Sequence, residues 1–458
     1  MSRSWLLAFY GLLFLATTTL RAAEPDKTNF VVILCDDLGY SDLGCFGHPK
    51  IKTPHLDKLA TDGMRLTDCY AGAPVCSPSR AGLLTGRIPN RVGIYDWIPQ
   101  KSPMHLRASE VTVATLLKQA GYQTCHVGKW HCNGMFNSAE QPQPGDHGYD
   151  HWFATQNNAA PTHKNPTNFV RNGKRVGPTD GYSSQVIVDE AMSWLTQRDQ
   201  SKPFLLMVWL HSPHETIATA SSFVEPYLAA AETAEQAEYF GNVSQVDHEV
   251  GRLLKSLDDG GLRENSLVFF SSDNGPETLN RYKGSERSYG SRQPLRGVKL
   301  HLYEGGIRVP GIVRWPQRIK PGQTSHEPVA SYDLLPTFCA IAGVTPPVDR
   351  ALDGSSLLPL LNGEPVNRAK PLYWQYDRAI GGPNRVALRD GDWKLLADAG
   401  LSKFELYNLK TDFSETRNRA ASEPAKLDEL AAKMRLLHAE IKAEGPTWPE
   451  GPGTQNQK

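Results

Sequence analysis

The residue best placed to do chemistry is Cys76, in the segment Cys76-Ser-Pro-Ser-Arg80 that continues as Ala-Gly-Leu-Leu-Thr-Gly-Arg87. A single cysteine is most often a small buried apolar side chain, and Cys76 alone would be interpreted that way. Here it precedes a proline and a helix-compatible run, so it is predicted near a helix N-terminus, where anionic groups are stabilised. Arg80 lies about one turn further on and can point at the same place. The segment therefore predicts an oxyanion site beside a reactive side chain.

Two pairs of oxygen-bearing side chains follow predicted strands. Asp36 and Asp37 come after the apolar segment Phe-Val-Val-Ile-Leu-Cys, and Asp273 and Asn274 come after Leu-Val-Phe-Phe-Ser-Ser. Either pair could simply begin a turn, because Asp and Asn are turn formers. In a parallel sheet, however, two strand ends can converge, and three carboxylates with one amide oxygen then need a hard cation. Oxygen ligands favour Ca²⁺ or Mg²⁺ over Zn²⁺.

Basic side chains occupy two further segments. Lys129 and His131 lie in the segment Gly-Lys-Trp-His, which on its own would be interpreted as a surface lysine and a packed histidine. His211 and His214 follow the strand predicted at residues 204–210. This second pair is therefore expected at the same edge of the sheet as the aspartates.

Residues 76–87 match every fixed position of the signature C-x-P-x-R followed by x-x-L-L-T-G-R, so the chain resembles the type I sulfatases of the alkaline phosphatase superfamily. Residues 345–350, 352–354 and 357–361 are similar to the branch that contains arylsulfatase A and N-acetylgalactosamine-6-sulfatase. The resemblance covers nearly the whole chain after its first residues. It implies a sulfuric ester hydrolase in which a maturase oxidises the cysteine to formylglycine (3-oxoalanine), an aldehyde carried as its hydrate.

The resemblance also implies a role for each site residue. Lys129 and Lys299 are expected to bind the sulfate group, whose charge Arg80 helps to neutralise. His131 is expected to contact the hydrated aldehyde, and His214 to protonate the leaving group. The loop around Lys299 has the sequence Val-Lys-Leu-His-Leu where the family has G-K-G-T-T. This departure is expected to change how the substrate fits and to leave the role of the lysine unchanged. One Ca²⁺, with Mg²⁺ as the less favoured ion, is expected on the modified Cys76 and on Asp36, Asp37, Asp273 and Asn274.

The expected substrate is a sulfated carbohydrate that is desulfated in an exo manner, with aryl sulfates as simple analogues. Residues 155–165 are rich in hydrogen-bonding groups that suit a sugar, although an ordinary polar loop has the same composition. The predicted substrate contacts are Asn157, Asn158, His211, Arg281 and His301.

Two other functions fit part of this pattern. The first is hydrolysis of phosphonate or phosphate esters by a member of the same superfamily. The combination of Lys129, His131 and Lys299 favours sulfate esters over these substrates. The second is non-catalytic sugar binding, which the complete set of catalytic residue types disfavours.

These residues need a scaffold, and the alternation of strand and helix patterns predicts an α/β fold with a large, mostly parallel sheet flanked by helices. Helices are predicted from Pro54, at residues 110–119, at 185–196 and along 239–257. From about residue 370, short strands and one amphipathic helix predict a small α+β domain with an antiparallel sheet. The predicted organisation is a signal peptide at 1–23, a catalytic domain at 24–365, a C-terminal domain at 366–444 and a loose tail at 445–458.

Composition limits the partners and the compartment. The chain has 458 residues, and its 49 basic and 49 acidic side chains give no net charge, which argues against nucleic acid and anionic membrane surfaces. The charged start, short apolar core and Ala22-Ala23 are typical of a secretory signal, with an uncleaved membrane anchor as the alternative. Export to the periplasm or the outside is expected. Seven cysteines leave at least one unpaired, and Cys125 could pair with Cys132.

Overall fold

The structure, a computed structural model, describes residues 27–279 and 287–454. The signal peptide predicted at residues 1–23 and the predicted substrate contact Arg281 lie outside the described residues. Within those two ranges, no helix combines the length and the hydropathy that a bilayer span requires.

The larger sheet has the strand order β10-β2-β9-β8-β1-β7-β3-β4-β5-β6, and β11 also pairs with β2. Its centre, β8-β1-β7-β3-β4, is parallel, whereas β9 runs antiparallel to both β2 and β8. The predicted mostly parallel sheet is therefore confirmed. The strand bounds are β1 Asn29–Asp36, β2 Met64–Tyr70, β3 Gln123–Lys129, β4 His151–Thr155, β5 Val170–Arg171, β6 Lys174–Arg175, β7 Phe204–Pro213, β8 Ser266–Ser272, β9 Arg308–Arg314, β10 Gln323–Ser325 and β11 Val329–Ala330.

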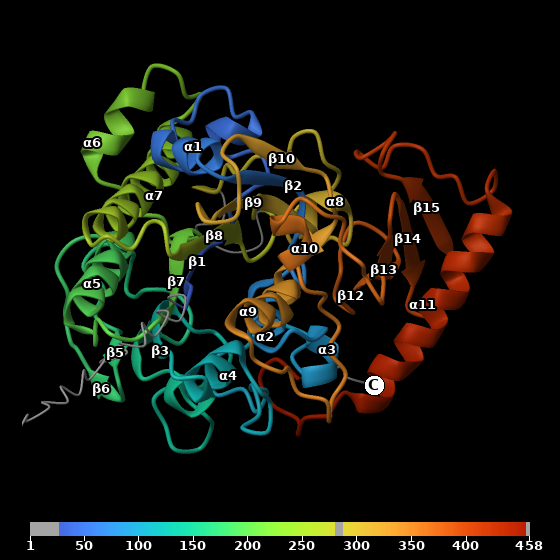
Figure 1. The fold of residues 1–458 in the computed structure, drawn as a ribbon. Coiled ribbons are helices and arrows are strands. Elements are labelled where there is room, and N and C mark those ends of the chain that lie inside the picture. The colour runs from blue at the N-terminus through green and yellow to red at the C-terminus, as the bar shows by residue number, and fades with distance from the viewer. Residues whose placement is uncertain (1–26, 280–286, 455–458) are drawn as a thin grey trace, which may run out of the picture.

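Strand β1 is apolar from Phe30 to Cys35 because both of its faces are buried. Even-numbered side chains from Phe30 to Leu34 enter a core with α2, α4 and α9, while odd-numbered ones from Val31 to Cys35 enter a core with α1, α5 and α7. Helices thus cover both faces of the sheet (Figure 1). The main helices are α1 Pro54–Thr61, α2 Cys76–Thr85, α4 Val113–Gln119, α5 Ser183–Gln197, α7 Ala234–Asp259 and α9 Leu334–Ala342; the short ones are α3 Pro89–Val92, α6 Ser221–Val224, α8 Glu304–Ile307 and α10 Leu358–Leu361.

The helices predicted from sequence correspond to α1, α4, α5 and α7. Helix α4 begins at Val113 rather than at the predicted Glu110. The reason is local, because the Thr112 side chain accepts the backbone N–H of Thr115 at 3.1 Å and caps the helix there.

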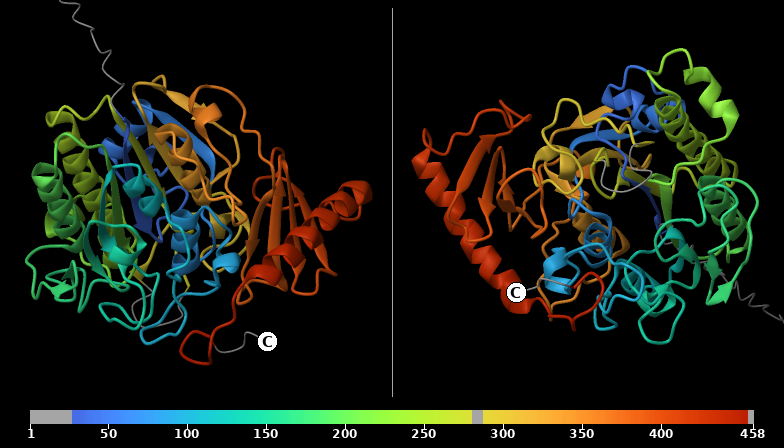
Figure 2. Two further views of the ribbon diagram at one scale, coloured as in Figure 1. Left: turned by 60° about the horizontal axis from the view of Figure 1, so that its bottom comes forward. Right: turned by 180° about the vertical axis from the view of Figure 1, so that it is seen from behind.

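The smaller sheet is antiparallel, as predicted, and comprises β12 Leu372–Gln375, β13 Asn384–Asp390, β14 Trp393–Asp398 and β15 Phe404–Asn408. Helix α11, Pro424–Glu444, packs along it, and Figure 2 shows both beside the larger sheet. The boundary at residue 365 stays a prediction; residues 362–371 connect α10 to β12. Six buried charged side chains and the Tyr70 hydroxyl connect the two sheets, and we call them the joint cluster: Asp68, Tyr70, Glu304, Arg308, Arg389, Lys394 and Glu415.

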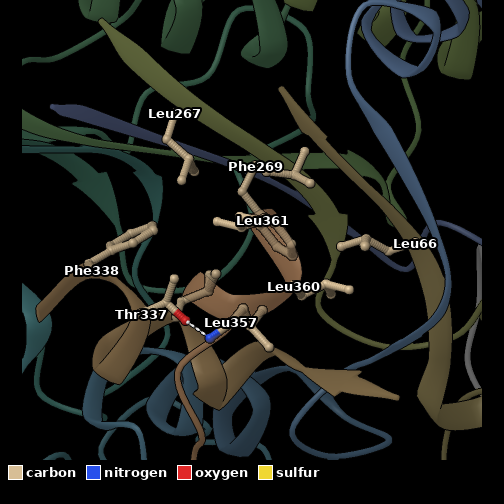
Figure 3. Close-up of a pocket in the computed structure, with 10 residues that line it drawn as sticks. Leu66, Leu267, Phe269, Thr337, Phe338, Leu357, Leu360 and Leu361 are labelled. Carbon is tan, nitrogen blue, oxygen red and sulfur yellow. Dashed lines mark hydrogen bonds between the residues drawn. The ribbon is translucent and has the colours of Figure 1, made fainter. Parts of the chain in front are cut away.

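A small cavity of about 10 Å³ lies between the larger sheet and helices α9 and α10 (Figure 3). Its lining is almost entirely apolar and includes Leu66, Phe269 and Leu361. The hydroxyl of Thr337 is already bound there, because it accepts the backbone N–H of Leu357 at 2.8 Å. This cavity is therefore a packing defect and has no groups that could bind an ester.

All seven cysteines lie within the described residues, and all seven are free. Cys125 and Cys132, which sequence left open as a pair, are both buried and not bridged. The Cys76 thiol is therefore not held in a disulfide.

Candidate active site

Four parallel strands bring the predicted chemistry to one edge of the larger sheet. Asp36 ends β1 and Asp37 follows it, Asp273 follows β8, Lys129 ends β3, and His214 follows β7. Because β8, β1, β7 and β3 are neighbours that run in one direction, their carboxyl ends lie together. We call the following residues the sheet-edge cluster: Asp36, Asp37, Cys76, Arg80, Lys129, Asp273, Asn274 and Lys299.

Cys76 is the first residue of α2, as predicted, and its side chain is buried. Its Sγ and one carboxylate oxygen each of Asp36 and Asp273 all lie within 4.8 Å of one another. Burial raises the pKa of the Cys76 thiol, and the nearby cation of Lys129 only partly opposes this. The thiol is therefore protonated at neutral pH and is a weak nucleophile as it stands.

Arg80 connects helix α2 to the carboxyl ends of strands β8, β1 and β3. Its Nε donates to Asp273 Oδ2 at 2.9 Å, and its Nη2 lies 2.7 Å from the same oxygen and 3.7 Å from Asp36 Oδ2. Its Nη1 donates to the backbone oxygen of Lys129 at 3.1 Å, and its guanidinium lies 5.1 Å from the centre of the Trp209 ring. The side chain is completely buried, so these contacts hold its charge in one position.

Asp37 receives donors from two distant segments. Lys299 Nζ lies 2.7 Å from Oδ1 and donates to Oδ2 at 2.8 Å, and the side-chain amide of Asn274 donates to Oδ1 at 2.7 Å. His214 Nε2 lies 3.5 Å from Oδ2. The backbone φ of Asp37 is 64°, a left-handed conformation that costs energy for a residue with a side chain and is typical of functional sites.

The charges of the cluster shift one another's pKa values. Burial raises the pKa of Asp36, but Lys129 and the other nearby cations outweigh it and hold that pKa well below its usual range. Burial and the charge of Asp36 raise the pKa of Asp273 to about 7. Burial lowers the pKa of Lys299, but Asp37 and its neighbours outweigh it and raise that pKa well above the usual value.

Two oxygens of the cluster are buried and accept no hydrogen bond from the described residues: Asp36 Oδ1 and Asn274 Oδ1. A buried oxygen without a donor is costly, and carboxylate and amide oxygens are the ligands that hard cations use. The predicted metal ligands Asp36, Asp37, Asp273 and Asn274 therefore fit a divalent cation by their chemistry and by these free oxygens.

The predicted histidines flank the cluster. His131, with a left-handed φ of 53°, has its Nε2 3.1 Å from the Ile98 backbone oxygen, and His211 has its Nε2 2.7 Å from Thr155 Oγ1. Burial lowers the pKa values of His131 and His211 well below the usual range, and burial lowers that of His214 as well, although Asp37 opposes it. All three rings are therefore held mainly neutral in this arrangement.

The predicted substrate contacts separate into two groups. Asn158 lies beside the cluster, because its side-chain nitrogen is 3.1 Å from His214 Nδ1, and the backbone oxygen of Asn157 accepts from Thr155 Oγ1 at 2.6 Å. His301 is turned toward the loop that carries it, with Nδ1 3.0 Å from the Val298 backbone oxygen.

The C-terminal sheet holds the loop that carries Lys299. The backbone N–H of Ile380 donates to the Leu300 oxygen at 3.1 Å, and the Tyr303 hydroxyl donates to Glu405 of β15 at 2.9 Å. The backbone N–H of Lys299 donates to the Pro276 oxygen at 3.1 Å. The departure of this loop from the family pattern therefore leaves the lysine at the cluster.

Sequence reasoning missed one acidic residue of the site. Glu277 is buried, and its Oε2 lies 4.0 Å from Lys299 Nζ. Its signal was its place four residues after Asp273, in the same segment beyond β8.

Comparison with known proteins finds similar chains and family models over most of the sequence. The family model described as Sulfatase matches residues 28–344, and the model described as N-sulphoglucosamine sulphohydrolase, C-terminal, matches residues 298–443. N-acetylgalactosamine-6-sulfatase of Rattus norvegicus is 32% identical over 424 residues, which are 87% of this chain and 77% of the relative. Arylsulfatase A of Homo sapiens is 36% identical over 415 residues, which are 84% of this chain and 77% of the relative.

A solved structure extends the likeness to three dimensions. The crystal structure of Ps i-CgsB in complex with k-i-k-neocarrahexaose has a TM-score of 0.81 and 27% identity, and the match covers 93% of this chain and 96% of that one. The family model, the two relatives and this neighbour all match over most of the chain. The chain therefore belongs to the sulfatase family and is a sulfuric ester hydrolase with the alkaline-phosphatase-like fold.

Proposed function

We propose that the chain hydrolyses sulfate esters of carbohydrates, with Cys76 oxidised to formylglycine and one Ca²⁺ bound at the sheet-edge cluster. The observation that carries this proposal is the position of Cys76, whose Sγ lies within 4.8 Å of oxygens of both Asp36 and Asp273. The raised pKa of its thiol adds to the argument, because a protonated thiol needs modification before it can attack sulfur.

The expected ligands of the cation are Asp36, Asp37, Asp273, Asn274 and the modified Cys76. When bound, the cation and the hydrated aldehyde supply a polarised oxygen nucleophile at the N-terminus of α2. The oxygen donors suit either Ca²⁺ or Mg²⁺, and Ca²⁺ is preferred because of the resemblance to the family.

The cations of the cluster bind the sulfate group. A sulfate monoester is negatively charged and repels nucleophiles, so its oxygens must be neutralised before attack. Lys129 and Lys299 carry ammonium groups 2.5 Å from Asp36 and 2.7 Å from Asp37, at the place where the ester must lie. Arg80, fixed by Asp273, adds a third positive charge.

Two histidines move protons. His214 protonates the departing alcohol, since its ring is the least buried of the three and lies beside Asn158. His131 accepts a proton from the hydrated aldehyde, because burial holds its ring neutral and its Nδ1 accepts no hydrogen bond from the described residues.

A carbohydrate sulfate is the substrate class that the relatives support, since one is named for an N-acetylgalactosamine-6-sulfate activity and the structural neighbour holds an oligosaccharide. The polar side chains expected to orient the sugar are Asn157, Asn158, His211, Arg281 and His301. We also propose that residues 1–23 direct export to the periplasm or the outside, and that a maturase acts on the chain transiently.

The proposal is tested with protein that is co-expressed with a maturase. Its kcat/KM is measured on 4-nitrophenyl sulfate, 4-nitrophenyl phosphate and a 4-nitrophenyl phosphonate. The sulfate should be preferred by at least about tenfold, because the three cations match one sulfate group. Faster turnover of the phosphonate would instead assign the chain to the alternative reaction.

A further inference from the structure

A groove of about 550 Å³, lined by both polar and apolar groups, lies outside the sheet-edge cluster and has no role in the reaction described above. Segments far apart in the sequence form it, and its lining includes Lys101, Phe136, Asn137, Gln156, Asn168 and Arg175.

Hydrogen bonds connect the inner wall of this groove directly to His131. The side chain of Gln156 donates to the Ile98 oxygen at 3.0 Å, which is the oxygen that His131 Nε2 approaches. The backbone N–H of His131 in turn donates to the Gln156 oxygen at 2.8 Å. The backbone N–H of Ile98 also donates to Ser77 Oγ at 3.0 Å, so the wall continues to the residue after Cys76.

A second connection reaches the residue assigned to the leaving group. The Asn168 side chain lines the groove and donates to the backbone oxygen of Asn158 at 2.9 Å. The side chain of Asn158 lies 3.1 Å from His214 Nδ1. The groove is therefore connected through Asn158 to His214, the residue proposed to protonate the leaving group.

The groove carries positive charge that the fold does not use. Lys101 and Arg175 are exposed, and neither forms an ion pair within the described ranges. Lys101 has a φ of 65°, a conformation that suits glycine or asparagine better than lysine, and its N–H is held by the Gly134 oxygen at 2.9 Å. Glu140 is the one acid in the lining and lies 3.4 Å from Ser138 Oγ.

We propose that this groove binds the sugar units next to the one that is desulfated. Lys101 and Arg175 would contact sulfate or carboxylate groups on those units, while the amides of Asn137 and Asn168 meet hydroxyl groups. Phe136, half-buried in the lining, offers an apolar surface to a sugar ring. The inference rests on the proposed function and adds to it a preference for anionic oligosaccharides over small sulfate esters.

The test compares a double variant, Lys101→Ala with Arg175→Ala, with the control Lys174→Ala, an exposed lysine next to Arg175 that does not line the groove. Isothermal titration measures the binding of hexasaccharides and disaccharides of ι-carrageenan and chondroitin 6-sulfate. Unmodified protein is used, so binding does not depend on turnover. For a hexasaccharide that binds the wild type, the double variant should bind about tenfold or more weakly, because two charge-assisted contacts are lost.

Affinity for the disaccharides should fall less than affinity for the hexasaccharides, because a disaccharide places only one neighbouring unit in the groove. The kcat/KM of matured protein on 4-nitrophenyl sulfate should stay within about twofold of wild type, because that probe has no sugar unit to reach the groove. The inference is overturned if the wild type binds neither hexasaccharide. It is also overturned if the double variant keeps wild-type affinity, or if Lys174→Ala causes an equal loss. Failure of the proposed function is seen separately, as wild-type protein that binds the hexasaccharide but, after co-expression with a maturase, hydrolyses no sulfate ester.

Discussion

The sheet-edge cluster and the joint cluster both bury acids and bases together, but they satisfy these groups differently. In the joint cluster, three carboxylates face three cations, and each carboxylate meets at least two donors. Glu304 accepts from Tyr70 at 2.6 Å and from Lys394 at 2.8 Å. Glu415 lies 2.8 Å from Lys394 and accepts the Glu304 backbone N–H at 2.7 Å.

The sheet-edge cluster also has three carboxylates and three cations, but it leaves two oxygens over. Within the described residues, Asp36 Oδ1 and Asn274 Oδ1 are buried and accept no hydrogen bond.

A structural network of buried charges and a ligand site can therefore be separated by how their oxygens are satisfied. Buried charge alone does not mark function, because both clusters contain it. The difference lies in the buried oxygens that accept no hydrogen bond. In the joint cluster this oxygen is Glu415 Oε1, which lies 2.8 Å from the Lys394 ammonium, whereas Asp36 Oδ1 and Asn274 Oδ1 lie at one place, as the oxygens of a cation site do. The joint cluster should therefore control stability, and the sheet-edge cluster should control activity.

Replacing the cysteine should give the largest effect. Cys76→Ala should lower kcat by about 10⁴-fold or more, as expected when a nucleophile is removed. The free energy of unfolding should change by only ~1 kcal/mol, because the side chain is small. Steady-state kinetics and urea unfolding measure the two quantities, with the buried Cys339→Ala as an active control. A fully active Cys76→Ala protein would refute the mechanism.

Disrupting the joint cluster should have the opposite effect, a large loss of stability with little loss of activity. Lys394→Met leaves Glu304 and Glu415 buried without their shared cation, so the free energy of unfolding should fall by ~3–5 kcal/mol. The folded fraction should keep kcat within a few-fold of wild type. The exposed Lys403→Met, in the turn between β14 and β15, serves as the control and should unfold like wild type. A Lys394→Met protein of unchanged stability would contradict the role of the joint cluster.

Removing the cation should have a smaller effect on stability. A chelator should lower the free energy of unfolding by ~3 kcal/mol if the free cation concentration before chelation was about 100 times its Kd. Lys394→Met should show the same response, and Asp37→Ala should show none, since it lacks a ligand. Urea unfolding with and without chelator, together with metal analysis, checks this. Full activity in a thoroughly chelated sample would exclude the metal.

The leaving-group histidine should give the smallest and most selective effect. His214→Ala should reduce kcat on a sugar sulfate by about 10²-fold, since an alkoxide leaves slowly without a proton. On 4-nitrophenyl sulfate the loss should stay below about tenfold, because that leaving group hardly needs protonation. Equal losses on the two substrates would remove His214 from this role.

The two clusters also differ in how far sequence could predict them. Asp36, Asp273 and Lys129 each follow a recognisable buried strand, so the parallel sheet predicts that they meet. The strands β2 and β9 were not predicted, because β9 pairs antiparallel with its neighbours and leaves no strand–helix alternation.

The joint cluster left no signal in the sequence. Asp68, Glu304 and Arg389 lie in three distant segments, and each would be interpreted as an ordinary surface charge. Their pairing depends on how β13 and β14 pack against the larger sheet, which local patterns do not encode. Glu277 was missed for a similar reason, because only the position of Lys299 shows that it is at the site.

The most direct test of the account is the chemical state of Cys76 in active protein. Trypsin should release residues 66–80 as one peptide, which contains both Cys69 and Cys76. After maturation, mass spectrometry should find Cys69 as an alkylated thiol and position 76 as an aldehyde that reacts with a hydrazide. The aldehyde fraction should equal the fraction of active enzyme. A fully active protein whose peptide carries two thiols would contradict the account.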